Sequence, residues 1–153
     1  MLTIEPLSAH PEARAACIGW SAAEWAEASG FQQSDFAAEF DRILDDPVDE
    51  MFVALADGRP VGMACLLEQD AVPGFEHHSP WLSTVVVAPE ARRKGIAAAL
   101  IAHVERYAAM GGDDRLFLAT GTPGLYVAQG WEVMDIARHG SGDVFVMTKG
   151  IAA

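Results

Sequence analysis

The chain has 153 residues, of which 51% are hydrophobic and 21% are charged, and this composition is typical of one globular domain spanning residues 1–153. Its formal net charge of −12, from 22 acidic and 10 basic residues, excludes a nucleic-acid-binding surface, because phosphate contacts need clustered Lys and Arg. We expect a cytoplasmic protein with no membrane contact, since residues 1–10 lack a secretion pattern and no run of about 18 apolar residues follows.

The N-terminal third contains one strand pattern and two helix patterns. Residues 2–7 are predicted to form a short strand, and residues 13–28, rich in Ala and Glu, place apolar side chains at helical spacing. Gly30 is expected to end this helix. Ser34 is expected to cap the next helix, because its hydroxyl can accept a hydrogen bond from a free first-turn N–H, and Pro47 marks the end of that helix.

The middle of the chain predicts a hairpin, a loop and a central strand. Residues 51–56 and 61–67 are apolar, and the Asp57-Gly58 pair between them favours a tight antiparallel turn. Residues 68–80 lose periodicity and gather Pro, Gly, His and Glu, as loops do. Residues 82–87 are apolar on both faces, which predicts a strand at the centre of the sheet.

The C-terminal half begins with the strongest helix pattern, over residues 94–110, which Gly111-Gly112 is expected to end. The remaining patterns predict three strands and one short helix, over residues 116–119, 125–129 (helix), 131–137 and 143–148. We therefore predict an α/β fold with a mixed, mostly antiparallel sheet of about seven strands, flanked by about four helices.

The two cysteines carry no recognisable site. Cys17 and Cys65 lie far apart, without a Cys-x-x-Cys pair and without His residues at metal-ligand spacing. We interpret them as buried free thiols and predict no metal site and no disulfide.

A basic segment, Arg92-Arg93-Lys94-Gly95-Ile96-Ala97, connects the central strand to the strongest helix. Unpaired backbone N–H groups and the helix dipole attract anions at such a position, and Gly95 lets the backbone approach a phosphate closely. A nucleoside-triphosphate loop would need Gly-Lys-Ser/Thr, and a dinucleotide fingerprint would need glycines where Ala97 and Leu100 stand. The segment therefore predicts a pyrophosphate site, and the alternative interpretation is a solvated helix start.

On these residues the sequence resembles the GNAT superfamily of acyl-CoA-dependent N-acyltransferases. Its signature Gln/Arg-x-x-Gly-x-Gly/Ala is matched by Arg92, Gly95 and Ala97 between strand and helix. Residues 125–131, Leu-Tyr-Val-Ala-Gln-Gly-Trp, are similar to the family's Tyr-x-x-x-Gly-Phe/Trp segment, and the order of elements also agrees. Pro80-Trp81-Leu82, together with the Gly-Trp pair in residues 125–131, is similar to a group of small bacterial members.

The resemblance implies an N-acetyltransferase that takes acetyl-CoA as its acyl donor. The backbone amides of residues 93–98 would hold the CoA pyrophosphate, and the central strand would pair with the pantetheine arm. The residues implied in CoA binding are Val85, Val86, Val87, Arg92, Arg93, Lys94, Gly95, Ile96, Ala97 and Ala98.

The same resemblance suggests catalytic residues. Tyr126 matches the family's frequent general acid, because a phenol stays protonated at neutral pH and can donate to a departing thiolate; the alternative role is core packing. Trp81 stands where some relatives place a carboxylate, so a direct carboxylate base is in doubt. Glu68 or His78 is the candidate base, acting through water, although each is also typical of a solvated loop.

The acceptor is expected to be a primary amine of a small molecule or peptide, attacked directly. Trp20, Trp25, Phe31 and Trp81 are candidates for an acceptor pocket, with core packing as the alternative. A non-catalytic acyl-CoA-binding sensor is the competing function, and an interaction domain without cofactor is the third. A homodimer fits the resemblance, although no residue pattern identifies one.

Overall fold

The structure is a computed structural model that describes residues 1–139 and 142–152. The strands are β1 Leu2–Pro6, β2 Glu50–Ala56, β3 Arg59–Leu67, β4 Trp81–Val87, β5 Arg115–Thr120, β6 Glu132–His139 and β7 Gly142–Gly150. The α-helices are α1 Arg14–Ser29, α2 Gln33–Asp45, α3 Ile96–Met110 and α4 Gly124–Val127, and short 3-10 turns are η1 Leu7–Ala9, η2 Pro11–Ala13 and η3 Pro89–Ala91. Within the described ranges, no helix has the length and apolar character needed to cross a membrane.

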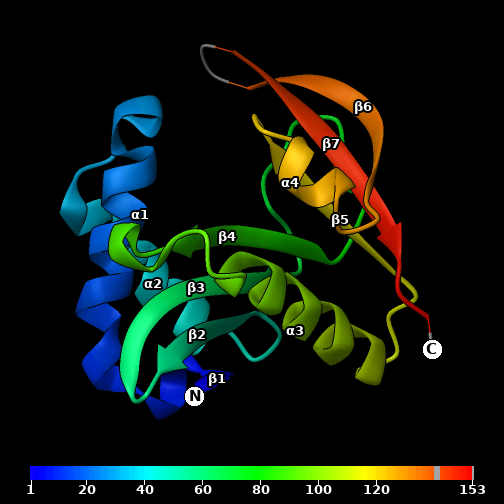
Figure 1. Cartoon of the computed structure of the whole chain (residues 1–153). Coiled ribbons are helices and arrows are strands. Elements are labelled where there is room, and N and C mark those ends of the chain that lie inside the picture. Colours follow the sequence, from blue (N-terminus) through cyan, green and yellow to red (C-terminus); the bar gives the residue numbers. More distant parts are fainter. Residues whose placement is uncertain (140–141, 153) are drawn as a thin grey trace.

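The seven strands form one sheet in the order β1-β2-β3-β4-β5-β7-β6. Neighbours are antiparallel except for β4 and β5, which are parallel. The predicted mixed, mostly antiparallel α/β fold is confirmed, and so is the central position of β4. Figure 1 shows β5, β6 and β7 diverging from the other four strands.

Helices cover both faces of the first four strands (Figure 1). On one face α3 buries Ile96, Leu100 and Val104 against β2, β3 and β4. On the opposite face α1 and α2 bury apolar side chains such as Cys17 and Phe40 against the same strands. Because β4 is covered on both faces, its apolar sequence agrees with its position.

The β2–β3 hairpin turns where the Asp-Gly pair predicts it. Ala56 pairs with Arg59, and both Asp57 (φ 49°) and Gly58 (φ 84°) adopt the left-handed conformation that a two-residue hairpin turn requires. The turn fixes the register of β2 on β3, so that five consecutive residues of β2 and seven of β3 are buried in the core.

Three details of the helix ends differ from the sequence prediction. Ser34 lies inside α2, because Gln32 is the N-cap and the Asp35 carboxylate accepts the Gln32 backbone N–H at 2.8 Å. Helix α3 begins two residues later than predicted, since Gly95 before it is left-handed. At the other end, Gly111 keeps a right-handed φ of −80°, and only Gly112 is left-handed.

Both cysteines are buried and free, as the sequence analysis predicts. Burial raises the pKa of the Cys17 thiol to about 12, so the thiol stays protonated at neutral pH. The two thiols therefore serve as packing groups of the α1 face.

Candidate active site

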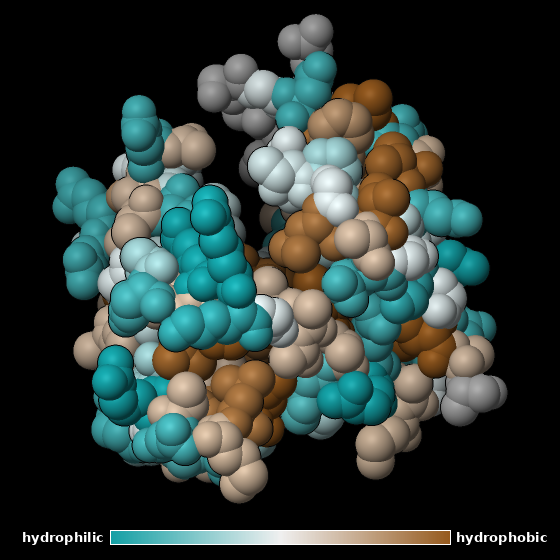
Figure 2. Space-filling model, in the orientation of Figure 1, coloured by the Kyte–Doolittle hydropathy of each residue, from teal (hydrophilic) through white to brown (hydrophobic). Residues whose placement is uncertain are grey.

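The sheet opens between β4 and β5. Trp81 and Phe117 are the paired residues of the two parallel strands, so in the described part of the chain β4 has no partner on its β5 side from Leu82 to Val87. The surface is hollowed between the part containing α1 and the part containing α4, with hydrophobic side chains in its depth (Figure 2). The unpaired edge of β4 therefore faces a space that a ligand can enter.

A β-bulge sits in the middle of β4. Met63 pairs with Val86 and Cys65 pairs with Ser83, so one β3 residue opposes two on β4. Thr84 has a φ of 55°, which is rare for a β-branched residue. Bulges of this kind redirect side chains near active sites, and here the hydroxyls of Ser83 and Thr84 meet at 3.1 Å.

The basic segment forms a turn at the N-terminus of α3. Arg93 (φ 65°) and Gly95 (φ 77°) are both left-handed, and the first helical acceptor is the Gly95 carbonyl, which receives the Ala99 N–H at 3.0 Å. Among the described residues, the N–H groups of residues 93–98 have no backbone acceptor. A row of free amides at a helix N-terminus binds anions, and a non-glycine residue held at positive φ is typical of a functional loop.

The charged side chains of this turn are arranged around its rim. Arg92, Arg93 and Lys94 are exposed. The Arg92 Nε donates to the Val87 carbonyl at 3.2 Å, and its guanidinium lies 3.9 Å from the Glu24 carboxylate of α1. The turn is thereby held to the end of β4 and to α1, while Arg93 and Lys94 supply positive charge beside the free amides.

The three valines at the end of β4 face two different sides of the sheet. Val85 and Val87 pack partly buried on the α3 side, and Val86 is buried on the side of α1 and α2. A ligand arm along the open edge of β4 would therefore meet the side chains of Val85 and Val87, and only the backbone of Val86.

Tyr126 lies on α4, across the opening from β4. Its ring is half-buried and meets Trp131 edge to face with the centroids 6.3 Å apart, and its backbone carbonyl accepts the Trp131 N–H at 3.0 Å. Burial raises the pKa of Tyr126 to about 12. The phenol therefore remains a proton donor over the whole physiological range.

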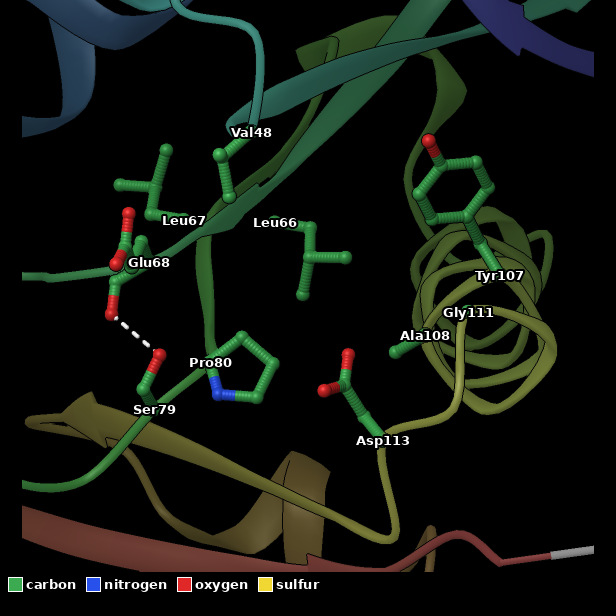
Figure 3. A pocket seen from close by; sticks show the side chains of 10 residues that line it. All are labelled: Val48, Leu66, Leu67, Glu68, Ser79, Pro80, Tyr107, Ala108, Gly111 and Asp113. Atoms are coloured by element: carbon green, nitrogen blue, oxygen red, sulfur yellow. Dashed lines mark hydrogen bonds between the residues drawn. The ribbon is translucent and has the colours of Figure 1, made fainter.

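Glu68 directly follows β3 and lies near the C-terminal end of α3, whereas the basic turn lies at the N-terminus of that helix. It is exposed at the rim of a cavity of about 320 Å³, where Figure 3 shows Glu68 and Asp113 on either side of Pro80. This cavity contacts the C-terminal end of α3 at Ala108, whereas the basic turn precedes Ile96. Twelve residues of helix correspond to about 18 Å, so the structure does not bring Glu68 to the basic turn.

His78 is packed into the loop that precedes β4. Its ring lies 4.6 Å from the Phe117 ring, and its carbonyl accepts the Trp81 Nε1–H at 2.7 Å. It is half-buried, and Trp81, whose indole its carbonyl binds, is 1% exposed. The imidazole therefore lies near the point where β4 and β5 meet.

The four aromatic candidates for an acceptor pocket lie in different environments. Trp20 and Trp25 are half-buried on α1, and Phe31 is 48% exposed, with its ring edge to face on Phe36. Trp81 is enclosed in the core with Phe117. The side chains that a ligand can contact are thus those of α1 and the following turn, whereas Trp81 is buried and serves core packing.

Sequence reasoning missed three polar residues near the opening. Ser83 and Thr84 stand within the apolar run of β4, and the Ser83 hydroxyl donates to the Asp70 carboxylate at 3.2 Å. Two adjacent hydroxyl residues inside a buried strand were a usable signal, because such groups need polar partners. Asp70 gave no such signal, since it lies in the aperiodic loop.

No group of three or more His, Cys, Asp or Glu residues able to hold a metal occurs in the part of the chain that the structure describes. The splayed β4 edge, the free amides at the start of α3 and Tyr126 of α4 lie around one opening in the sheet. The resemblance noted in the sequence associates this arrangement with the class of acyl-CoA-dependent acyltransferases.

The comparisons agree with this class. The profile of the acetyltransferase (GNAT) family matches residues 9–131, so the chain belongs to the GNAT acetyltransferase family and is an acyltransferase. It is similar in structure to an aminoglycoside 6'-N-acetyltransferase complexed with coenzyme A, with a TM-score of 0.81 and 17% identity over 99% of this chain and 98% of that one. A comparison with curated proteins finds no match.

Two other solved structures have the same fold. A phosphinothricin acetyltransferase from Sinorhizobium meliloti, in complex with AcCoA, has a TM-score of 0.74 and 21% identity over 99% of this chain and 89% of that one. A spermidine N-acetyltransferase from Vibrio cholerae, in complex with CoA and spermine, has a TM-score of 0.75 and 18% identity over 98% and 95%. At these identities the similarity concerns the fold, and the acceptors differ among the three proteins.

Proposed function

We propose that this protein, as one domain over residues 1–153, transfers the acetyl group of acetyl-CoA to a primary amine of a small molecule or peptide by direct attack. The observation that carries the proposal is the combination of two features at one place. The free amides of residues 93–98 follow β4 after the short turn η3 and are held to the strand's end by the bond from Arg92 Nε to the Val87 carbonyl, and the edge of β4 has no partner strand from Leu82 to Val87. Family membership supports acetyl transfer, and the amines named for the similar structures support an amine acceptor.

The residues fit acetyl-CoA, which supplies an acetyl group activated as a thioester. The amides of residues 93–98 would hold its pyrophosphate, with Arg93 and Lys94 adding charge. Val85 and Val87 would contact the pantetheine arm, whose amides find free backbone groups on β4. The cradle has room, because a Cβ added at Gly95 would meet no atom within 4 Å.

Two proton movements accompany transfer, since the amine must lose a proton to give a neutral amide and the departing CoA sulfur takes up a proton to leave as the thiol. We assign the donor role to Tyr126, whose half-buried ring is carried by α4 on the β5 side of the opening. The base that acts through water remains assigned to Glu68 or His78. Of these two, His78 is favoured by its position beside Trp81 at the base of the opening.

Calorimetry with CoA tests the binding half of the proposal. Ala97→Asp places a carboxylate at the free amides and is expected to weaken CoA binding at least tenfold, because like charges repel at a site built for phosphate. Ala102→Asp, equally half-buried on α3 but further from its N-terminus, is the matched control and should bind CoA as the wild type does. Equal affinity of both variants would place CoA elsewhere.

An assay of thiol release from acetyl-CoA tests the transfer half. The acceptors should include a polyamine, an aminoglycoside, an amino acid and a peptide N-terminus. Release that depends on one of these amines is the expected result. CoA binding without release in the presence of any of them would instead identify an acyl-CoA-binding protein that performs no transfer.

A further inference from the structure

A small polar group interrupts the apolar α1 face of the central strands. The bulge at Thr84 places the Ser83 and Thr84 hydroxyls 3.1 Å apart, and Ser83 donates to the Asp70 Oδ1 at 3.2 Å. Ser83 is the β4 partner of Cys65, which is buried on the side of α1. Asp70 therefore lies over this face of β4, beside the bulge.

The loop that carries Asp70 is firmly attached to the sheet. Val72, two residues further on, is 4% exposed and packs with Trp81 and Phe117. Burial is the main cause that raises the pKa of the Cys65 thiol, and the negative charge of Asp70 adds to it, so the carboxylate lies close to that strand. A half-buried carboxylate held in this way is positioned before any ligand arrives.

The carboxylate and the proposed CoA arm lie on opposite faces of the same strand. Val85 and Val87 face the α3 side, and Ser83, with Asp70 above it, faces the α1 side. The two faces meet at the edge of β4 that has no partner strand. An acceptor that approaches the thioester from the α1 side passes the Asp70 carboxylate.

We propose that Asp70 binds an ammonium group of the acceptor other than the amine that is acetylated, and that the acceptor is therefore a cationic compound with several amines, such as a polyamine or an aminoglycoside, rather than an amino acid. This inference rests on the acetyl transfer proposed above. A carboxylate forms a charge-assisted hydrogen bond with an ammonium group but repels the carboxylate of an amino acid. The net charge of −12 acts in the same direction, because it attracts cations to the whole molecule.

The experiment measures spermidine binding to the CoA complex by calorimetry, so that no turnover is needed. Asp70→Asn is expected to weaken spermidine binding at least tenfold, Asp70→Glu to restore part of the affinity, and CoA affinity to stay within twofold in both. Glu76→Gln is the matched control, because Glu76 is an exposed carboxylate of the same loop whose Oε1 accepts the Gly74 N–H at 3.0 Å. It should bind spermidine as the wild type does.

Three results would overturn the inference. Spermidine affinity of Asp70→Asn within twofold of the wild type would remove Asp70 from the acceptor site. If Asp70→Asn lost affinity for CoA together with spermidine, Asp70 would have a structural role. If Asp70→Asn does not fold, Ser83→Ala takes its place, and this variant must bind spermidine more weakly while its CoA affinity is unchanged. A wild type that binds CoA but not spermidine would reject a cationic acceptor, whereas failure to bind CoA would reject the proposed function itself.

Discussion

Tyr126 is the residue whose environment most clearly matches a chemical role. Its half-buried ring packs against Trp131 and against the core on the α3 side of the sheet. Burial penalises the phenolate, and this raises the pKa to about 12. A group that must donate a proton late in a reaction gains from this shift, because it cannot lose the proton to solvent beforehand.

Replacement of Tyr126 by Phe is expected to lower kcat about a hundredfold, since general acid catalysis contributes on that order, while the KM for acetyl-CoA stays within twofold. The sign of the pKa shift adds a second expectation. Because the phenol stays protonated up to about pH 12, the kcat of the wild type should not fall at alkaline pH through loss of the Tyr126 proton. The alkaline side of the pH profile should therefore have the same shape in the wild type and in the variant. Steady-state kinetics from pH 6 to about pH 10 measure both quantities.

Tyr107→Phe is the control for this prediction. Tyr107 is 45% exposed on α3, lies against Phe52 and lines the cavity at whose rim Glu68 stands, on a different element from Tyr126. Because Tyr107 is not the assigned proton donor, loss of its hydroxyl should leave kcat unchanged. A Tyr126→Phe protein that turns over as fast as the wild type would leave the ring with a packing role only.

At the scale of secondary-structure elements, one carboxylate joins α3 to the diverging strands. Glu105 accepts the Trp131 Nε1–H at 3.1 Å and the Lys149 ammonium at 2.8 Å, and Lys149 also donates to the Gln129 carbonyl at 2.7 Å. Glu105 is only 15% exposed. The network therefore fixes β7 and the segment after α4 relative to α3, the helix that follows the basic turn.

Glu105→Gln is expected to lower the free energy of unfolding by about 2 kcal/mol, because the partly buried Lys149 ammonium loses its counter-charge. For a protein of this length this corresponds to a fall in Tm of roughly 4–8 °C. Thermal unfolding measures it. Glu132→Gln, an exposed change on β6, should shift the free energy by less than about 0.5 kcal/mol, and equal effects of both variants would contradict the network's role.

Gly62 lets α3 approach β3 closely. A Cβ there would lie 3.0 Å from the Val86 carbonyl oxygen and 3.1 Å from the Leu100 Cδ1. Gly62→Ala is therefore expected to lower the free energy of unfolding by about 1–3 kcal/mol, because α3 must shift. The variant should also bind CoA more weakly, because the basic turn shifts with α3. Gly19→Ala on α1 meets no atom within 4 Å and should stabilise the protein slightly. Chemical denaturation and CoA calorimetry compare the two.

The elements that the sequence predicts are those with a local signal. The apolar run of β4, the stripe of α3 and the Asp57-Gly58 turn each carry their pattern within a few residues, and all three are confirmed. The basic turn was found in the same way, because glycine and the basic residues stand together. Helix starts were less accurate, since caps such as Gln32 depend on a reciprocal contact with Asp35.

The parts that the sequence does not predict depend on pairing between distant segments. The opening of β4 follows from its single pair with β5, which brings Trp81 to Phe117. The bulge at Thr84 exists only relative to the β3 register. Asp70 reaches Ser83 because Val72, on the same loop, is buried against Trp81 and Phe117. The contact of Val72 joins a loop to the sheet and leaves no repeating pattern in the sequence.

At the scale of the whole molecule, the proposed donor and the proposed acceptor carry charges of opposite sign. The three consecutive basic residues from Arg92 to Lys94 stand in the basic turn, in a chain with 22 acidic and 10 basic residues overall. An anionic donor would thus be bound by the local positive charge of the basic turn, and a cationic acceptor would be attracted by the negative charge of the rest of the molecule. The two attractions act over different ranges, so salt should affect them unequally.

Raising NaCl from about 20 to 300 mM shortens the Debye length from roughly 20 Å to below 8 Å, and we expect the spermidine Kd of the CoA complex to rise about fivefold or more. The CoA Kd should rise less, because the short-range amide contacts of residues 93–98 are screened weakly and the −12 charge opposes binding of an anion at low salt. Calorimetry at both salt concentrations compares the two constants, with Tm recorded to show that the fold is unchanged. A spermidine Kd that does not respond to salt would mean that the acceptor is held by contacts other than charge.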